Sequence, residues 1–232
     1  MALIEDAPSL PHTIELRADA PIRLAGSTLD HRAHVCAFFN NADEAYQVLL
    51  PFIKQGFELA QKSVHTIDPR RRADHRRRLR TAGIELDSAM RNEQLEVVDW
   101  SSTHLSEGAF DPDRTLSRYR RIMEDAAKKG FPLTRFVTDM GWALEAELDA
   151  NALLDYEART NYEWMQQRGP VNPVICTYDL NLFTADIIVD VMRTHPMVII
   201  GGTLRENPFF VPPGEFLEQL RRREPTRLRR VG

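Results

Sequence analysis

The chain has 232 residues, of which 43% are hydrophobic and 28% are charged, and its formal net charge is −4 at pH 7. This composition is typical of a globular protein that can bury a core, and the negative balance argues against general attraction to nucleic acid or anionic membranes. Two cysteines are too few for a disulfide framework, and the sequence has neither a membrane-spanning apolar run nor a signal peptide, so we expect a cytoplasmic protein.

Strand and helix patterns alternate along the chain after a polar lead that covers residues 1–30. Apolar, β-prone segments predict strands, and segments with apolar residues at three- and four-residue spacing predict helices. Within the lead, "TIELRADAPIRL" is a candidate edge strand. In chain order, the main predicted elements are strand His34–Phe39, helix Ala42–Gln61, strand Ser63–Ile67, helix Pro69–Ala82, strand Leu95–Trp100, helix Pro112–Lys129, strand Arg135–Asp139, helix Trp142–Gln167, strand Val174–Tyr178, helix Thr184–Thr194 and strand Met197–Ile200.

This alternation predicts a single α/β domain. Strands separated by helices of such length are joined by right-handed crossovers, and they form a mainly parallel sheet that helices cover on both faces. We assign residues 31–222 to this domain and residues 223–232 to a basic tail, which we expect to be solvated and frayed.

The strand that ends at Tyr178 is followed by Asp179, as is the magnesium-binding strand of many P-loop nucleotide hydrolases. Such proteins also need closely spaced glycines and a lysine after another strand, because backbone N–H groups and the lysine bind the phosphates. After the first strand this chain reads "FFNNADEAY", which contains neither residue type. The glycine pair Gly201-Gly202 follows a strand but does not open a clear helix. We therefore expect no hydrolysis of nucleoside triphosphates.

Residues just past the strands are the candidate ligand contacts, because parallel sheets bind ligands beyond the carboxyl ends of their strands. This set is rich in aromatic and poor in basic side chains, which suits a small organic molecule better than a triphosphate. The alternative is that the aromatic side chains only cover the core beneath the loops. The predicted apolar contacts are Phe38, Phe39, Trp100, Trp142 and Tyr178, and the predicted polar contacts are Asn40, Asp179 and His195.

Both cysteines lie in the middle of predicted strands. His34 shares one strand face with Cys36, and His195 follows a helix at the end where its dipole is negative. The thiols could form a redox pair or join a metal site with a histidine, but we favour two buried thiols that pack as small hydrophobes. Because their strand positions also allow a contact with a ligand, the predicted ligand-binding set still includes His34, Cys36 and Cys176. We predict no metal ion and no cofactor.

Two helical segments carry charges whose role depends on which way they face. Glu157, in "YEARTN", is a candidate polar contact if it points inward, and a solvated helix surface is the alternative that we favour. The segment "PRRRADHRRRLRTA" has seven arginines between Arg70 and Arg80. We interpret it as a solvated helix and do not predict a nucleic-acid contact.

Several segments together point to a known family: "HVCAFFNNADEAYQVLLPFIKQGFELAQKSVHTIDP", "FDPDRTL", "VTDMGWAL", "YEARTN", "VICTYDLNLFTADIIVDVMRTHPMVIIGG" and "ENPFFVPPGEFL". In this order they resemble the MEDS domain, the methanogen/methylotroph sensory domain, from about His31 to Arg222. The family is similar to RecA-like and clock-ATPase domains but has lost their phosphate-binding loop. The resemblance implies a RecA-like sheet and a signal-input domain that senses small hydrocarbon derivatives.

We therefore predict a non-catalytic sensory domain that binds a small organic ligand. The alternatives are an enzyme that uses Cys36, Glu157 or Asp179, and an adaptor that binds only proteins. The sequence shows no helix-turn-helix or kinase segment, so we expect the signal to pass through a homodimer or a signalling partner protein. The aromatic and proline-rich segment "NPFFVPP" would either cover the pocket or form that interface.

Overall fold

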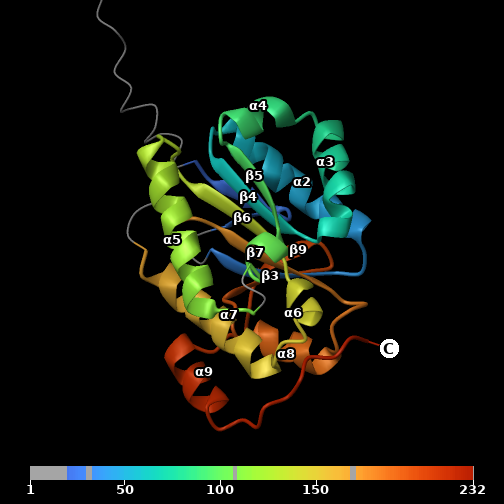
Figure 1. The fold of residues 1–232 in the computed structure, drawn as a ribbon, viewed down its shortest axis with the longest axis vertical. Coiled ribbons are helices and arrows are strands. Elements are labelled where there is room, and N and C mark those ends of the chain that lie inside the picture. Colours follow the sequence, from blue (N-terminus) through green and yellow to red (C-terminus); the bar gives the residue numbers. More distant parts are fainter. Residues whose placement is uncertain (1–19, 30–32, 107–108, 168–170, 232) are drawn as a thin grey trace, which may run out of the picture.

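The computed structural model describes residues 20–29, 33–106, 109–167 and 171–231. Its main strands are β3 (His34–Phe39), β4 (Lys62–Ile67), β5 (Leu95–Asp99), β6 (Thr134–Asp139), β7 (Val174–Asp179), β8 (Met197–Ile200) and β9 (Thr203–Glu206). They form one sheet in the order β5-β4-β6-β7-β3-β8-β9 (Figure 1). Every neighbouring pair is parallel except β8 and β9, which are antiparallel. The predicted α/β fold with a mainly parallel sheet is confirmed.

Helices cover both faces of this sheet, and each face buries its own apolar core. One face packs against α2 (Ala42–Glu58), α3 (Arg72–Thr81) and α4 (Leu86–Arg91), whereas the other packs against α5 (Pro112–Lys128), α6 (Trp142–Glu145), α7 (Ala150–Met165), α8 (Ala185–Met192) and α9 (Pro213–Leu220). Short 3₁₀ helices, η1 (Pro69–Arg71) and η2 (Trp100–Ser102), follow β4 and β5. Successive side chains of a strand point to opposite faces, so Cys36 and Phe38 join one core while Val35 joins the other.

Side-chain caps stabilise the first turns of α2 and α5. Asn41 accepts a hydrogen bond from the backbone N–H of Glu44 at 2.9 Å and so caps α2. Asp111 caps α5 in the same way, through the N–H of Arg114 at 3.0 Å, and Pro112 occupies the first helical position. Such caps satisfy amide groups that have no partner inside the helix.

The helix predicted over Trp142–Gln167 is wrong as a single element. It is interrupted after α6, where Glu147 has a φ of 48° in the left-handed region. Asp149 then caps α7 by accepting the N–H of Asn151 at 2.9 Å. A non-glycine residue with this φ ends a regular helix, and an aspartate at the next start favours a new one.

Both ends of the domain differ from the sequence prediction. In the described part of the candidate edge strand, β1 (Ile22–Leu24) pairs with β2 (Ser27–Leu29) in a separate two-stranded sheet; residues 13–19 lie outside the described residues. The tail is not frayed over its described part, because Leu228 is buried and its N–H donates to the carbonyl of Leu148 at 3.0 Å. Within the described chain, no helix is long and apolar enough to cross a bilayer.

The sequence prediction also missed the strand β9. It follows Gly201-Gly202, whose φ values of 56° and 71° make the tight turn of the β8–β9 hairpin. Both values lie in the left-handed region that glycine adopts without steric cost. The strand has only one buried side chain, Leu204, so no apolar pattern marked it.

A buried arginine fixes helix α2 against the sheet. Arg135 on β6 is fully buried, and its guanidinium donates to the carbonyl of Phe52 and to the side-chain oxygen of Gln61, both at 2.6 Å. It also donates to the side chain of Gln55 at 3.0 Å. Helix α2 carries Gly56 where it passes over this arginine, and a Cβ there would lie 2.9 Å from Arg135 Cδ.

We therefore expect Gly56→Ala to lower the free energy of unfolding by about 1–3 kcal/mol, because the added methyl group overpacks a side chain held by hydrogen bonds. The matched control is Gly214→Ala in the first turn of α9, where a Cβ would meet nothing within 4 Å. This control should be neutral or more stable by up to about 1 kcal/mol, because alanine favours helices over glycine. Urea unfolding compares the two, and equal stability changes would contradict the close packing at Gly56.

Candidate functional site

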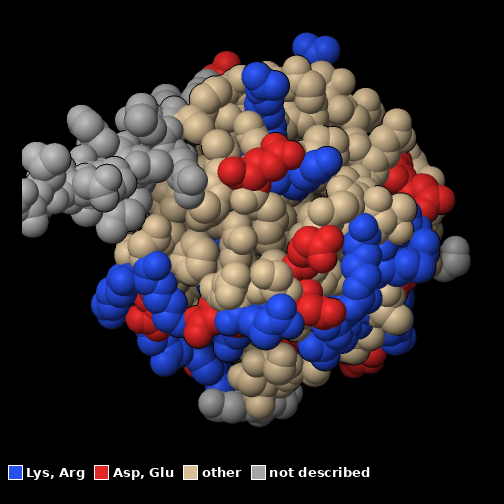
Figure 2. Space-filling view, turned by 90° about the horizontal axis from the view of Figure 1, so that it is seen from above, with Lys and Arg blue, Asp and Glu red and all other residues tan. Residues whose placement is uncertain are grey.

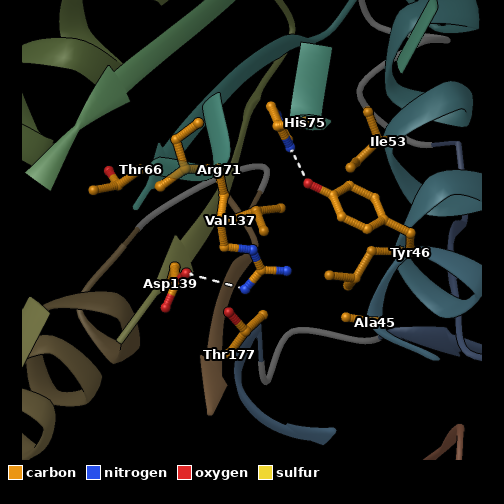
Figure 3. Close-up of a pocket in the computed structure, with 11 residues that line it drawn as sticks. Ala45, Tyr46, Ile53, Thr66, Arg71, His75, Val137, Asp139 and Thr177 are labelled. Carbon is orange, nitrogen blue, oxygen red and sulfur yellow. Dashed lines mark hydrogen bonds and ion pairs between the residues drawn. The ribbon is translucent and has the colours of Figure 1, made fainter. Parts of the chain in front are cut away.

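A pocket opens at the carboxyl ends of β4, β6 and β7, beneath the first turns of α2 and α3 (Figure 3). We call it the carboxyl-edge pocket, and its volume is about 70 Å³. Apolar side chains make up much of its wall, and a few polar groups converge on it. The lining residues are Ala45, Tyr46, Leu49, Ile53, Thr66, Ile67, Arg71, His75, Val137, Asp139 and Thr177.

A chain of hydrogen bonds leads from this pocket into the core. The hydroxyl of Tyr46 lies 2.7 Å from Nδ1 of His75, and Nε2 of His75 lies 3.0 Å from Nδ1 of His65 (Figure 3 shows the first contact). Burial and the nearby guanidinium of Arg71 lower the pKa of His75 to about 4, and burial lowers the pKa of His65 well below its usual value. Both imidazoles are therefore neutral at neutral pH, and each has one donor and one acceptor nitrogen.

Opposite charges face each other across the pocket. Arg71 Nη1 lies 3.7 Å from Asp139 Oδ2, and the other carboxylate oxygen of Asp139 accepts the N–H of Gly141 at 3.0 Å. Burial raises the pKa of Asp139. The hydrogen bond from Gly141 and the charge of Arg71 partly offset this rise. Because Arg71 is 40% exposed, its guanidinium can contact both the solvent and a bound polar group.

A smaller pocket adjoins the carboxyl-edge pocket and contains some of the predicted ligand contacts. Phe39, Tyr178 and Asp179 line it together with Arg71, and its volume is about 30 Å³. Predicted contact Asn40 lies beside it on the loop that precedes α2, where its N–H donates to Glu44 Oε2 at 2.8 Å. The N-terminus of α2 is thus occupied by its own cap and by a carboxylate, which disfavours a phosphate there.

The other predicted polar residues meet at a different place, inside the core between β3, β7 and α7. We call His34, Glu157, Cys176 and His195 the core cluster. Glu157 Oε2 lies 3.2 Å from Nε2 of His34 and 3.4 Å from Nε2 of His195. Cys176 Sγ lies 3.5 Å from Nε2 of His34 and 3.7 Å from Glu157 Oε2. One donor atom from each of the four residues falls within 4.8 Å of the others.

All four members of the core cluster are buried, so their protonation depends on one another. Burial alone would raise the pKa of Glu157, but the imidazoles of His195 and His34 beside the carboxylate hold it below its usual range. Burial, together with His195, lowers the pKa of His34 to about 4, and burial and Glu157 raise the pKa of Cys176. Tyr178 donates its hydroxyl to Glu157 Oε1 at 2.5 Å.

A second pocket lies at the amino ends of β3, β7 and β8, and His34 connects it to the core cluster. We call it the amino-edge pocket, and its volume is about 510 Å³. Phe210, from the predicted segment "NPFFVPP", contributes to its wall. The lining residues are Ala33, His34, Asn161, Trp164, Met165, Gln167, Val171, Pro196, Glu206, Asn207 and Phe210.

The remaining predicted contacts are buried in the core beneath the loops. Phe38, Trp100 and Trp142 belong to the apolar cluster on the α5–α9 face, and the ring of Trp142 stacks on His104 at a centroid distance of 4.5 Å. Cys36 is buried as a free thiol and is the register partner of Cys176. A ligand-binding role for these residues stays a prediction.

The sequence interpretation of two helices needs correction. Glu157 is not on a solvated surface, because α7 is nearly surrounded by protein and buries this carboxylate completely. Helix α3 is not solvated on all sides either, since it buries His75 and Leu79. Its arginines pair with neighbouring acids, as with Arg72 and Asp99 at 3.0 Å, and Figure 2 shows basic and acidic groups side by side at this end of the molecule.

None of the residues that line the carboxyl-edge pocket belongs to the predicted ligand-binding set. The polar ones among them that the sequence prediction missed include Tyr46, Arg71 and His75. Each lies on the helix or turn that follows a strand. The sequence prediction considered only the residues directly after each strand, and it would have included these three if it had extended into the first turns of the next helix. Arg71 and His75 were assigned instead to the arginine-rich helix as a whole.

These features define an α/β domain with a small pocket at the carboxyl edge of its sheet. The sequence profile of the MEDS domain, the "MEthanogen/methylotroph, DcmR Sensory domain", matches residues 33–196, and the chain belongs to this family. The chain is also 21% identical over 176 residues to the transcriptional repressor DcmR of Methylorubrum extorquens. That match covers 76% of this chain and 63% of the repressor, so it spans less than two thirds of this relative.

The buried histidines should make the stability of the domain depend on pH. His75 stays neutral in the folded state until about pH 4, whereas the unfolded chain binds its proton near the usual pKa of 6.5. Stability is therefore complete above pH 6.5 and is lost as the pH falls toward 4, by about 3 kcal/mol for this residue.

We expect His75→Gln to flatten the dependence of unfolding free energy on pH between 6.5 and 4, measured by urea unfolding at several pH values. Tyr46→Phe is the matched control, because it removes the contact to His75 but leaves the imidazole buried. The control should keep the wild-type slope. Equal slopes in the wild type and His75→Gln would show that His75 does not titrate as its burial requires.

Proposed function

We propose that the chain is a sensory domain that binds a small organic molecule in the carboxyl-edge pocket and releases it unchanged. The observation that carries this proposal is the convergence of Tyr46, Arg71 and His75 on a small, largely apolar cavity. Ligand sites of α/β proteins are mostly apolar cavities with a few polar groups that fix orientation, and they lie at this end of the sheet.

The size of the pocket limits the ligand. An apolar cavity of about 150 Å³ holds benzene, so a cavity of about 70 Å³ suits a molecule of only a few heavy atoms. A short hydrocarbon derivative with one polar group fits both this volume and the sensory role of the family. A nucleotide does not fit, and the cap and carboxylate at the start of α2 disfavour its phosphates. In this interpretation the sheet is RecA-like but serves a different ligand.

Two other functions make different demands on the site. An enzyme that used Cys36, Glu157 or Asp179 would need a substrate to reach one of them. The first two are fully buried, and Asp179, at the carboxyl end of β7, lines only the pocket of about 30 Å³. An adaptor would need no pocket. Analysis of the probe after binding separates these functions, because an enzyme converts it, a sensor returns it unchanged and an adaptor does not bind it.

We propose that the output is regulatory, in line with the related transcriptional repressor, and that it passes through a homodimer or a partner protein. Phe209 supports this proposal, because 60% of its surface is exposed while the adjacent Phe210 lines the amino-edge pocket. Phe209 is therefore the aromatic side chain of the segment "NPFFVPP" that is free to contact a partner.

Replacing Phe209 tests this output surface. We expect the wild type to sediment as a dimer at micromolar concentration and Phe209→Ala to weaken the dimer. Val189→Ala, at another exposed apolar side chain on α8, should leave it unchanged. A monomeric wild type would exclude the homodimer, and the search would then turn to a partner protein.

Filling the carboxyl-edge pocket tests the ligand site itself. We expect short 1-alkanols, compared from methanol to 1-hexanol, to stabilise the wild type in a saturable way, with the effect lost beyond a few carbon atoms. At 100 times the Kd the stabilisation is about 2.7 kcal/mol, or a rise in Tm of about 5–10 °C. Ala45→Leu should abolish the response, because its side chain would occupy the cavity.

Gln47→Leu is the matched control, since it introduces the same side chain at an exposed position of α2. It should respond to the alkanols as the wild type does. An Ala45→Leu variant that responds like the control would contradict the pocket assignment, and so would the absence of a saturable response to every alkanol.

A further inference from the structure

We infer that His34, Glu157, Cys176 and His195 form a binding site for a divalent transition-metal ion of the zinc class. This site lies in the core, away from the carboxyl-edge pocket, and the inference does not depend on the proposed ligand. It rests on the spacing of the donor atoms, on the orientation of one imidazole and on the charge of the cluster.

The donor atoms already have the spacing of a tetrahedral site. Four of the separations between them are 3.2, 3.4, 3.5 and 3.7 Å, and none exceeds 4.8 Å. Zinc binds nitrogen and oxygen at about 2.0–2.2 Å and sulfur at about 2.3 Å, which places tetrahedral neighbours about 3.3–3.8 Å apart. An ion would thus need only small movements of these side chains.

The imidazole of His195 directs an acceptor nitrogen into the cluster. Its Nδ1 lies 3.0 Å from the carbonyl oxygen of Val191, which can only accept, and 2.9 Å from the hydroxyl of Thr194. Because that hydroxyl donates to the same carbonyl at 2.8 Å, the contacts favour the hydrogen on Nδ1. In the neutral ring, Nε2 then presents a lone pair to the carboxylate of Glu157, and this buried nitrogen has no hydrogen-bond partner. A backbone carbonyl on the far nitrogen is the arrangement that orients histidine ligands of metals.

Two acceptors that face each other at 3.4 Å need a cation between them. A metal ion meets this need for the whole cluster, because one thiolate, one carboxylate and two neutral imidazoles balance the charge of a divalent ion. The buried centre is then neutral, which avoids the cost of an unpaired interior charge. Sulfur and nitrogen donors select zinc-class ions over magnesium or calcium.

The other possible cation is a proton on His195, which would form a buried ion pair with Glu157. That arrangement uses one histidine for the charge, and it leaves Cys176 and His34 only as neutral neighbours of Glu157. The metal instead joins β3, β7, α7 and the segment between α8 and β8 through four protein ligands, as in closed structural sites. The amino-edge pocket offers a route of entry, because His34 forms part of its wall.

Cobalt titration of the full-length protein, after removal of bound metal with a chelator, tests the site. We expect one Co²⁺ per chain, with the visible absorption of tetrahedral cobalt and a thiolate-to-cobalt charge-transfer band, and we expect Zn²⁺ to displace it. Cys176→Ser should lose the charge-transfer band. Cys36→Ser is the matched control, because this buried thiol is the register partner of Cys176 but contacts the carbonyl of Met197 at 3.7 Å.

The control should keep the band, and loss of the band in Cys36→Ser with retention in Cys176→Ser would overturn the assignment. Failure of the wild type to bind Zn²⁺ or Co²⁺ would also overturn it and favour the proton. X-ray absorption of the wild-type zinc form requires no variant, so it tests the site even if a cysteine variant misfolds. It should show one sulfur and three nitrogen or oxygen neighbours, and a shell without sulfur would exclude Cys176 as a ligand.

Discussion

Burial of both faces of the seven-stranded sheet is the constraint on which the other features of this domain depend. Polar side chains on its central strands cannot reach water, so each must find a partner inside the protein. The chain meets this demand in three places. Arg135 donates to α2, the His65–His75 pair connects β4 to Tyr46, and the core cluster joins β3, β7 and the segment before β8 to α7 through Glu157. All three join a strand to a helix, so polar groups as well as apolar packing position the helices.

The two ends of the sheet therefore have different chemistry. At the carboxyl edge, a small cavity lies beside Arg71 and ends at neutral imidazoles, which favours recognition of a small molecule with one polar group. At the amino edge, a larger pocket ends at His34, behind which lies a dense set of nitrogen, oxygen and sulfur donors. The first arrangement favours reversible binding, and the second favours a fixed cation that stabilises the fold. If both proposals hold, sensing and structural support lie at opposite ends of the same strands.

The sequence predicted the parallel core well because short β-prone segments alternate with longer segments of helical periodicity. It missed β9, where only Leu204 is buried, and it joined α6 to α7 because helical periodicity continues across a break that Glu147 makes with a left-handed backbone. Glu157 was misplaced because its charge was weighed more than its spacing from Leu153 and Asn161, which lie on the same buried face of α7. The pocket residues on α2 and α3 depend on packing between helices, which no local pattern encodes.

The most direct test of the sensory account is a crystal structure of the complex with the tightest-binding alkanol. The account predicts electron density for the unchanged probe between Tyr46, Arg71 and His75, with its polar group near the guanidinium or the tyrosine hydroxyl. Density in the amino-edge pocket beside His34 and Trp164, with the carboxyl-edge pocket free of the probe, would contradict it.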